Sequence, residues 1–313
     1  MTEGPLAVPR IVMVLLVRDE ADVIADNLRW HLGQGVDHVI AMDNGSVDGT
    51  TDILEDFAAT GALTLIHQPS DAFLQERWAS EMARMARDRL GADWVLPLDA
   101  DEFWTVPDGQ TLGEVVAQFD GEADMVRCAR RNLMAAREDL EAMSWHEALV
   151  WHADPPVPLP AGRRDDPTPL DPPLLYCRLP PKVAVHVARF ERFLPGNHDA
   201  VIAGDPVVRA SEEIMIYHAM IRDRAEFLRS NARVAEARER DPAVAPSTSW
   251  KSRRWWRMDP DAAYAEALPD AARLRADVAA GRVRRDTRLR DLIAAGRNAA
   301  RGAAAAEGGD VVG

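Results

Sequence analysis

Two aspartates, Asp99 and Asp101, follow an apolar run at residues 94–98 and flank a single alanine. In an extended backbone, residues i and i+2 point to the same side, so the two carboxylates are predicted to face one cleft. Neighbouring carboxylates repel each other unless a cation lies between them. Because Mg²⁺ and Mn²⁺ prefer oxygen ligands, the spacing predicts a divalent-cation site.

Two further polar clusters follow apolar runs earlier in the chain. Residues 18–20 (Arg-Asp-Glu) come after the run at 11–17, and residues 43–46 (Asp-Asn-Gly-Ser) come after the run at 36–42. The carboxyl ends of parallel strands meet at one edge of a sheet, where ligands bind in open α/β folds. Three polar clusters at such positions therefore favour one binding site over ordinary loop chemistry.

The elements that must position these clusters alternate between strand and helix signals. Strands are predicted over residues 11–17, 36–42, 63–67 and 94–98, with a helical pattern after each of the first three, and later strands over 124–129, 183–187 and 214–218. This order predicts an α/β fold, a Rossmann-like and mainly parallel sheet flanked by helices. Helical patterns at 225–240 and 262–280 predict a C-terminal helical extension.

Composition excludes several classes of protein. The 313 residues carry 51 acidic and 37 basic side chains, a net charge of −14, which argues against a broad nucleic-acid footprint. No run reaches the ~18–20 apolar residues that span a membrane, and no secretory signal is recognisable. The two cysteines, Cys128 and Cys177, form neither a disulfide framework nor a zinc motif. We expect a cytoplasmic protein, with peripheral attachment to the inner membrane face left open.

Three segments together resemble the donor-binding half of GT-A glycosyltransferases of family 2 in the broad sense. They are Val14-Leu-Leu-Val-Arg-Asp-Glu20, Asp43-Asn-Gly-Ser-Val-Asp-Gly-Thr50 and Trp94-Val-Leu-Pro-Leu-Asp-Ala-Asp-Glu-Phe103. The Asp-Ala-Asp-Glu-Phe sequence that ends the third segment resembles that of a bacterial subgroup of family-2-like transferases. The resemblance implies a GT-A-like fold and transfer of a sugar from a nucleotide-diphosphate donor (UDP, dTDP or GDP) to a hydroxyl of a glycan or small-molecule acceptor.

The resemblance also implies a division into parts. A GT-A-like catalytic domain is expected over 1–220, with the nucleotide-sugar-binding half at 11–104. A helical extension is expected over 221–297, and a frayed or disordered tail over 298–313. Residues 154–173 hold eight prolines and form a loop. One hypothesis makes this loop, with Arg163 and Arg164, a mobile flap near the acceptor side that donor binding orders. The competing interpretation is a disordered insertion far from the site.

Roles follow for individual residues. Asp43 would contact the base, Asp99 the ribose and metal, and Asp101 the Mn²⁺ or Mg²⁺ ion, with His198 or His218 as a further ligand. Asp48 is instead expected to cap its helix. The nucleotide-sugar site is predicted to comprise Val17, Arg18, Glu20, Asp43, Asn44, Gln75, Arg77, Asp99, Ala100 and Lys182. Structural interpretations compete at several positions: Arg77 as a solvated helix residue, Lys182 as a loop residue, and either histidine as a structural one.

The catalytic base is the least determined part of the prediction. An inverting enzyme needs a group that accepts the acceptor's proton, and Glu138, Asp139 and Asp199 are candidates without diagnostic context. Whether transfer inverts or retains configuration stays open.

Other functions remain as alternatives. A nucleotidyltransferase would share the nucleotide and metal requirements, but residues 18–22 lack the glycine-rich basic loop expected there. Phosphatase-like folds place Asp-X-Asp after the first strand, and methyltransferases need a glycine-rich first turn. A catalytically inactive GT-A-like module would bind sugar or protein without turnover.

Overall fold

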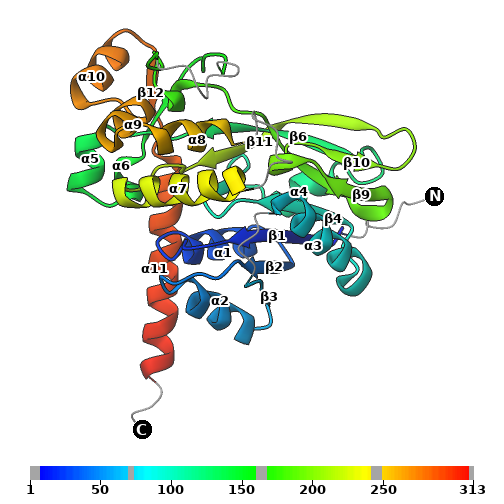
Figure 1. Ribbon diagram of the computed structural model, residues 1–313. Helices are drawn as coiled ribbons and strands as arrows, with labels where there is room; N and C mark the ends of the chain where they lie inside the picture. The colour runs from blue at the N-terminus through cyan, green and yellow to red at the C-terminus, as the bar shows by residue number, and fades with distance from the viewer. Residues whose placement is uncertain (1–7, 70–73, 160–167, 241–248, 310–313) are drawn as a thin grey trace. The chain divides into compact units, whose positions relative to one another are not determined.

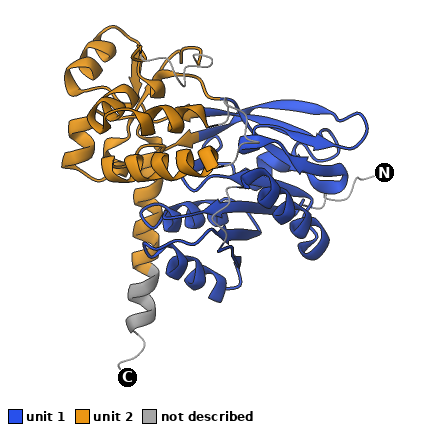
Figure 2. Cartoon of the chain, in the orientation of Figure 1, with its two compact units in different colours: residues 1–130, 180–216 blue, residues 131–179, 217–313 orange. Residues whose placement is uncertain are grey.

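The computed structural model describes residues 8–69, 74–159, 168–240 and 249–309, without the side chains of 303–309. The chain forms two compact units (Figure 2). Unit 1 comprises residues 1–130 and 180–216, and unit 2 comprises residues 131–179 and 217–313. The domain limits expected from sequence, at 220/221 and 297/298, stay a prediction.

The main sheet contains eight strands, most of them in unit 1 (Figure 1). Its order is β3-β2-β1-β4-β8-β6-β11-β5. β1 pairs in parallel with β2 and β4, and β2 pairs in parallel with β3, whereas β8 is antiparallel to β4 and β6. The strands are β1 (Ile11–Val17), β2 (His38–Asp43), β3 (Leu63–His67), β4 (Trp94–Leu98), β5 (Glu102–Thr105), β6 (Met125–Asn132), β8 (Lys182–His186) and β11 (Val208–His218).

Helices cover the parallel part of this sheet because its strands are apolar on both faces. In β1, Val12 and Val14 belong to a buried cluster with Trp78 and Met82 of α3. Ile11, Met13 and Leu15 alternate with them and are equally buried. The helices of unit 1 are α1 (Ile24–Gly33), α2 (Thr50–Ala59), α3 (Gln75–Leu90) and α4 (Leu112–Ala117), and a small hairpin joins β9 (Phe190–Phe193) to β10 (Ala200–Ile202).

Unit 2 is mainly helical, with one two-stranded ladder. β7 (Trp151–Ala153) pairs antiparallel with β12 (Val283–Arg285). The helices are α5 (Arg137–Ala142), α6 (Trp145–Ala148), α7 (Arg224–Arg240), α8 (Trp250–Arg257), α9 (Pro260–Ala267), α10 (Ala271–Ala279) and α11 (Arg288–Gly309). Short 3₁₀ turns lie at Leu174–Tyr176, Val187–Arg189 and Pro195–Asn197.

The predicted α/β class, a sheet flanked by helices with further helices at the C-terminal end, is confirmed. The parallel arrangement holds for β1 to β4, and antiparallel pairing begins at β8. One predicted helix, 262–280, is two helices in the structure. Pro269 cannot continue a helix, and the carboxylate of Asp270 accepts a hydrogen bond from Arg273 N–H and begins α10.

The predictions for the C-terminal tail and for the proline-rich loop have different outcomes. The backbone of α11 continues to Gly309, although fraying is expected from Asn298; the alanine-rich composition of this segment favours helix. In the proline-rich loop, residues 160–167, which include Arg163 and Arg164, lie outside the described residues. On its described flanks, Val157 forms a bridge with Cys177. The flap stays a prediction.

None of the helices in the described ranges is both long enough and apolar enough to cross a bilayer.

Candidate functional site

The turn between β4 and β5 carries the two aspartates. Glu102 N–H donates to the Asp99 carbonyl at 3.1 Å, and Asp99 N–H donates to the Glu102 carboxylate at 3.2 Å. The segment is therefore a hydrogen-bonded turn. The expectation that Asp99 and Asp101 share a side because the backbone is extended does not apply here. Both side chains are nevertheless partly exposed at the carboxyl end of β4.

Helix α1 holds this turn from behind. The side-chain amide of the buried Asn27 donates to the carbonyls of Ala100, at 2.9 Å, and Glu102, at 2.8 Å. One helical turn later, Nδ1 of His31 lies 2.9 Å from the Asn27 carbonyl, and Nε2 accepts from Trp104 N–H at 3.2 Å. The proton must then reside on Nδ1. Burial lowers the pKa of His31 to about 4, so the ring is neutral at pH 7.

A buried ion network lies under the turn. Nζ of Lys182 is 2.7 Å from Asp99 Oδ2 and 3.2 Å from Glu102 Oε2, and Nη1 of Arg130 is 2.8 Å from Glu102 Oε1. Glu102 and Lys182 are fully buried. Desolvation disfavours the ammonium, but Asp99 and Glu102 outweigh it and raise the pKa of Lys182. Lys182 is therefore a fixed positive charge beneath Asp99.

Asp99 is held on both of its oxygens. Oδ1 accepts from the Gln75 amide at 3.1 Å, and Oδ2 faces Lys182. Desolvation raises the pKa of Asp99; Lys182 opposes this effect, while the Glu102 and Asp101 carboxylates add to it. Three acidic groups thus act on one another at this turn, with two basic groups below them. Such an arrangement favours a further cation on the exposed side.

His198 lies beside the same network. Its Nδ1 is 3.0 Å from the Pro181 carbonyl, which can only accept, so Nδ1 carries the proton and Nε2 keeps its lone pair. Burial, reinforced by the charges of Arg130 and Lys182, lowers the pKa of His198 to about 3. Gly196 leaves room for the ring, since a Cβ there would lie 2.7 Å from it.

The loops after β1 and β2 are bonded to each other. Val47 N–H donates to the Asp19 carboxylate, and Asp19 N–H donates to Ser46 Oγ. Glu20 N–H donates to Thr50 Oγ1 at 2.8 Å. Asn44 N–H donates to the Val17 carbonyl at 2.9 Å. The predicted nucleotide residues Val17, Glu20, Asp43 and Asn44 are thereby brought together at the carboxyl edge of the sheet.

Within these loops, Asp43 and Asp48 both bond to neighbouring residues. The nearly buried carboxylate of Asp43 accepts from Ser46 N–H at 3.0 Å and Oγ at 2.6 Å, and from Thr51 Oγ1 at 2.5 Å. Asp48 precedes the N-cap of α2, Gly49, and accepts from Thr50 N–H. Asp48 is therefore the residue before the N-cap and not the N-cap itself. Its hydrogen bond from Thr50 N–H still lies at the start of α2.

Other predicted residues occupy different surroundings. Arg77 pairs with Glu81 on the exposed face of α3, as its solvated interpretation expects. Asp199 pairs with Arg127 at 2.9 Å on the surface of unit 1. Glu138 accepts from Ala271 N–H at the start of α10, and His218 is 3.0 Å from Asn132 Oδ1; all four of these residues belong to unit 2. Arg18 lies 4.0 Å from the Asp19 carboxylate.

Lys182 differs most from expectation. Its ammonium is enclosed and bonded to Asp99 and Glu102, and the residue begins β8 and does not lie in a loop. Glu102, Arg130 and Asn27 were not predicted as site residues. Glu102 belongs to the Asp-Ala-Asp-Glu-Phe motif, and its place in that motif could have identified it. Arg130 and Asn27 have no such signal in the sequence.

In the part of the chain that the structure describes, no metal site with three protein ligands is preformed. Among the described residues, no three His, Cys, Asp or Glu side chains converge in a way that could hold a metal ion. Mg²⁺ often takes one or two carboxylates and completes its shell with water and substrate phosphates. The pair Asp99 and Asp101 is compatible with that requirement.

Comparison with known proteins gives one family. Residues 14–142 match the sequence model of glycosyltransferase family 92. This segment begins within β1 and contains β2 to β6, the three polar loops and Arg130. It is less than half of the chain. A search of curated proteins finds no match.

Solved structures of S. aureus TarS are distantly similar. The TarS 1–349 structure is 12% identical, with a TM-score of 0.41, over 80% of this chain and 71% of that one. Its complex with UDP-GlcNAc is 12% identical, with a TM-score of 0.37, over 79% and 71%. A further TarS structure is 13% identical, with a TM-score of 0.41, over 77% of this chain and 45% of that one. The chain is thus similar in sequence to glycosyltransferase family 92 over residues 14–142.

Proposed function

We propose that the protein is a glycosyltransferase that moves a sugar from a nucleotide-diphosphate donor to a hydroxyl of a glycan or small-molecule acceptor. The observation that carries this proposal is the charged turn at Asp99–Glu102, located at the carboxyl end of β4 inside the segment that matches glycosyltransferase family 92. Ligands of open α/β sheets bind at this edge. UDP, dTDP and GDP sugars are the candidate donors.

The divalent ion of the proposal would be held by Asp101 with support from Asp99. When bound there, Mg²⁺ or Mn²⁺ would neutralise the charge that develops on the departing diphosphate. The protein's part is to fix the Asp99 carboxylate, through Lys182 at 2.7 Å and Gln75 at 3.1 Å, while Lys182 opposes the rise in the pKa of Asp99 that desolvation causes. Glu102 and Arg130 in turn fix Lys182 from below.

For the acceptor's proton, we favour Asp199 over Glu138. Asp199 lies in unit 1 with the donor turn, and 39% of its side chain is exposed. One of its oxygens pairs with Arg127, and the other accepts from Ala200 N–H. Glu138 lies in unit 2 and not in the unit that holds the donor turn, and its carboxylate accepts from the first N–H of α10. Asp199→Asn should slow turnover and leave nucleotide affinity unchanged, which calorimetry with UDP, dTDP and GDP would check.

The deciding experiment incubates the protein with UDP-, dTDP- and GDP-sugars and Mn²⁺ and measures released nucleoside diphosphate. We expect release from at least one donor, loss of release with EDTA, and a fall of at least about a hundredfold in Asp101→Asn, since one charged ligand is removed. Asp56→Asn, an exposed aspartate of α2, is the control and should behave as wild type. Release of pyrophosphate from a nucleoside triphosphate and a sugar phosphate would instead indicate a nucleotidyltransferase.

A further inference from the structure

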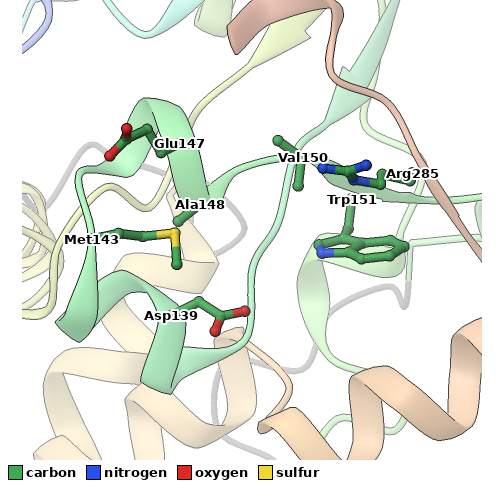
Figure 3. A pocket seen from close by; sticks show the side chains of 7 residues that line it. All are labelled: Asp139, Met143, Glu147, Ala148, Val150, Trp151 and Arg285. Carbon is green, nitrogen blue, oxygen red and sulfur yellow. The ribbon is translucent and has the colours of Figure 1, made fainter.

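Unit 2 contains a hollow of about 460 Å³ that the proposed transfer reaction does not use (Figure 3). Volumes of ~300–1,000 Å³ are typical of small-molecule sites. Trp151 and Arg285 line one side, and Asp139, Met143 and Glu147 line the other. All of these residues lie within unit 2.

Paired backbone positions hold Trp151 and Arg285 together. Trp151 of β7 is opposite Arg285 of β12 in the antiparallel ladder, so the two side chains emerge on the same face. Trp151 is half-buried and Arg285 is exposed. This side of the hollow therefore offers an indole next to a guanidinium.

Two short helices supply the opposite side. Asp139 comes from α5, Met143 follows that helix, and Glu147 comes from α6. Ser144 Oγ donates to Glu147 Oε2 at 2.5 Å, which fixes that carboxylate at the side of the hollow. Met143 is 44% exposed, so an apolar surface lies between the two carboxylates.

The chemistry of this lining selects among ligands. A compact cation would meet Arg285, and an anion would meet Asp139 and Glu147. A wholly apolar ligand would desolvate all three charges without compensating hydrogen bonds. A neutral ring with C–H groups on its face and hydroxyls on its edge matches every polar and apolar group of the lining. Its C–H face covers the indole. Its hydroxyls donate to the carboxylates, and a hydroxyl oxygen accepts from Arg285.

We propose that the unit 2 pocket, lined by Asp139, Met143, Glu147, Trp151 and Arg285, binds a neutral pyranose sugar. Binding needs neither donor nor metal. If the transfer reaction is also correct, the bound sugar belongs to the acceptor glycan; that clause alone rests on the proposed function.

Fluorine NMR of the full chain labelled with 5-fluorotryptophan tests the proposal. Trp151→Phe assigns the Trp151 signal among the nine tryptophans. The probes are the methyl glycosides of glucose, galactose, mannose and N-acetylglucosamine, added without nucleotide or metal. We expect at least one of them to shift the Trp151 signal saturably, and Asp139→Ala to weaken that binding about tenfold.

Controls separate this site from other effects. Calorimetry with the same glycoside measures binding in the variants, since Trp151→Ala also removes the fluorine signal. Trp151→Ala should abolish binding, whereas Trp256→Ala, which removes a 41% exposed tryptophan of α8 outside the hollow, should not. Thermal melts establish that each variant is folded. Asp101→Asn should bind the glycoside normally, so failure of the transfer reaction and failure of this site are distinguishable. The proposal is overturned if no glycoside moves the Trp151 signal, or if only tetramethylammonium or inorganic phosphate does.

Discussion

The ammonium of Lys182 lies 2.7 Å from a carboxylate oxygen of Asp99, although 83 residues separate the two in the chain. β8 follows β4 directly in the sheet order and is antiparallel to it, and this pairing brings the start of β8 to the end of β4. A buried cation therefore lies beneath the acidic turn. Its charge opposes the rise in the pKa of Asp99 that desolvation and the neighbouring carboxylates cause.

Removal of that cation should destabilise the fold. Lys182→Met leaves Asp99 and the fully buried Glu102 with less positive charge, and breaking a buried pair from one side costs about 3–5 kcal/mol. Urea unfolding would measure the loss. Arg77→Met, which breaks an exposed pair with Glu81, should cost under about 1 kcal/mol.

A double variant sharpens the first prediction. Lys182→Met combined with Glu102→Gln removes one charge of each sign, so the combined loss should be smaller than the sum of the two single losses. Additive losses, or equal losses in Lys182→Met and Arg77→Met, would show that the buried pair is not coupled as the distances indicate.

The hydrogen bonds of Asn27 give a second prediction. Asn27→Leu leaves the buried carbonyls of Ala100 and Glu102 without their donor, at ~1–3 kcal/mol for each group. The free energy of unfolding should fall by about 2–5 kcal/mol, and nucleotide release should fall further because the turn is no longer fixed. Asn231→Leu, which removes one bond inside α7, is the control and should leave nucleotide release unchanged. Full activity of Asn27→Leu would mean that α1 does not position the turn.

The sequence predicts the parallel strands well because each is rich in apolar residues and is followed by a polar loop. The strands at Leu63–His67 and Trp94–Leu98 match their predicted limits. Helix α8 was not predicted, since its residues Trp250–Arg257 read as polar. Its stability depends on contacts with a later helix, where Arg254 and Trp255 both bond to Glu266 of α9.

The candidate site likewise has residues that the local sequence pattern predicts and residues that only the tertiary structure brings together. Asp43, Asp99 and Asp101 follow strands directly, so local pattern is enough to select them. The partners of Glu102 come from β6 and β8, and only the order of strands brings Arg130 and Lys182 beneath it. Sequence spacing carries no information on that pairing. For the same reason, the sequence offers Lys182 as a nucleotide-sugar-site residue or as a loop residue, and its place in a buried ion network is visible only in the structure.

Asp43 provides a third prediction, because its carboxylate is bonded within its own loop. If it also contacts the base, Asp43→Ala should weaken binding of the preferred nucleoside diphosphate by ~1.5–3 kcal/mol, roughly ten- to a hundredfold, and reduce discrimination among UDP, dTDP and GDP. The matched variant Ser46→Ala/Thr51→Val removes the loop bonds but keeps the carboxylate, and should weaken all three nucleotides alike. Calorimetric affinities that change equally in both variants would assign Asp43 to loop structure alone.

The last prediction concerns His31, whose burial lowers its pKa from 6.5 to about 4. Between these values the unfolded chain binds a proton at this position and the folded protein does not. The free energy of unfolding should therefore rise with pH across this window, and stability should be lost as pH falls from 6.5 towards 4. At 1.36 kcal/mol per pKa unit, the contribution is about 2–4 kcal/mol. Urea unfolding at several pH values would measure it against His31→Gln, which cannot titrate in this range. The variant should show a flatter pH dependence, and parallel curves for the two proteins would mean that the buried ring does not cause the acid sensitivity.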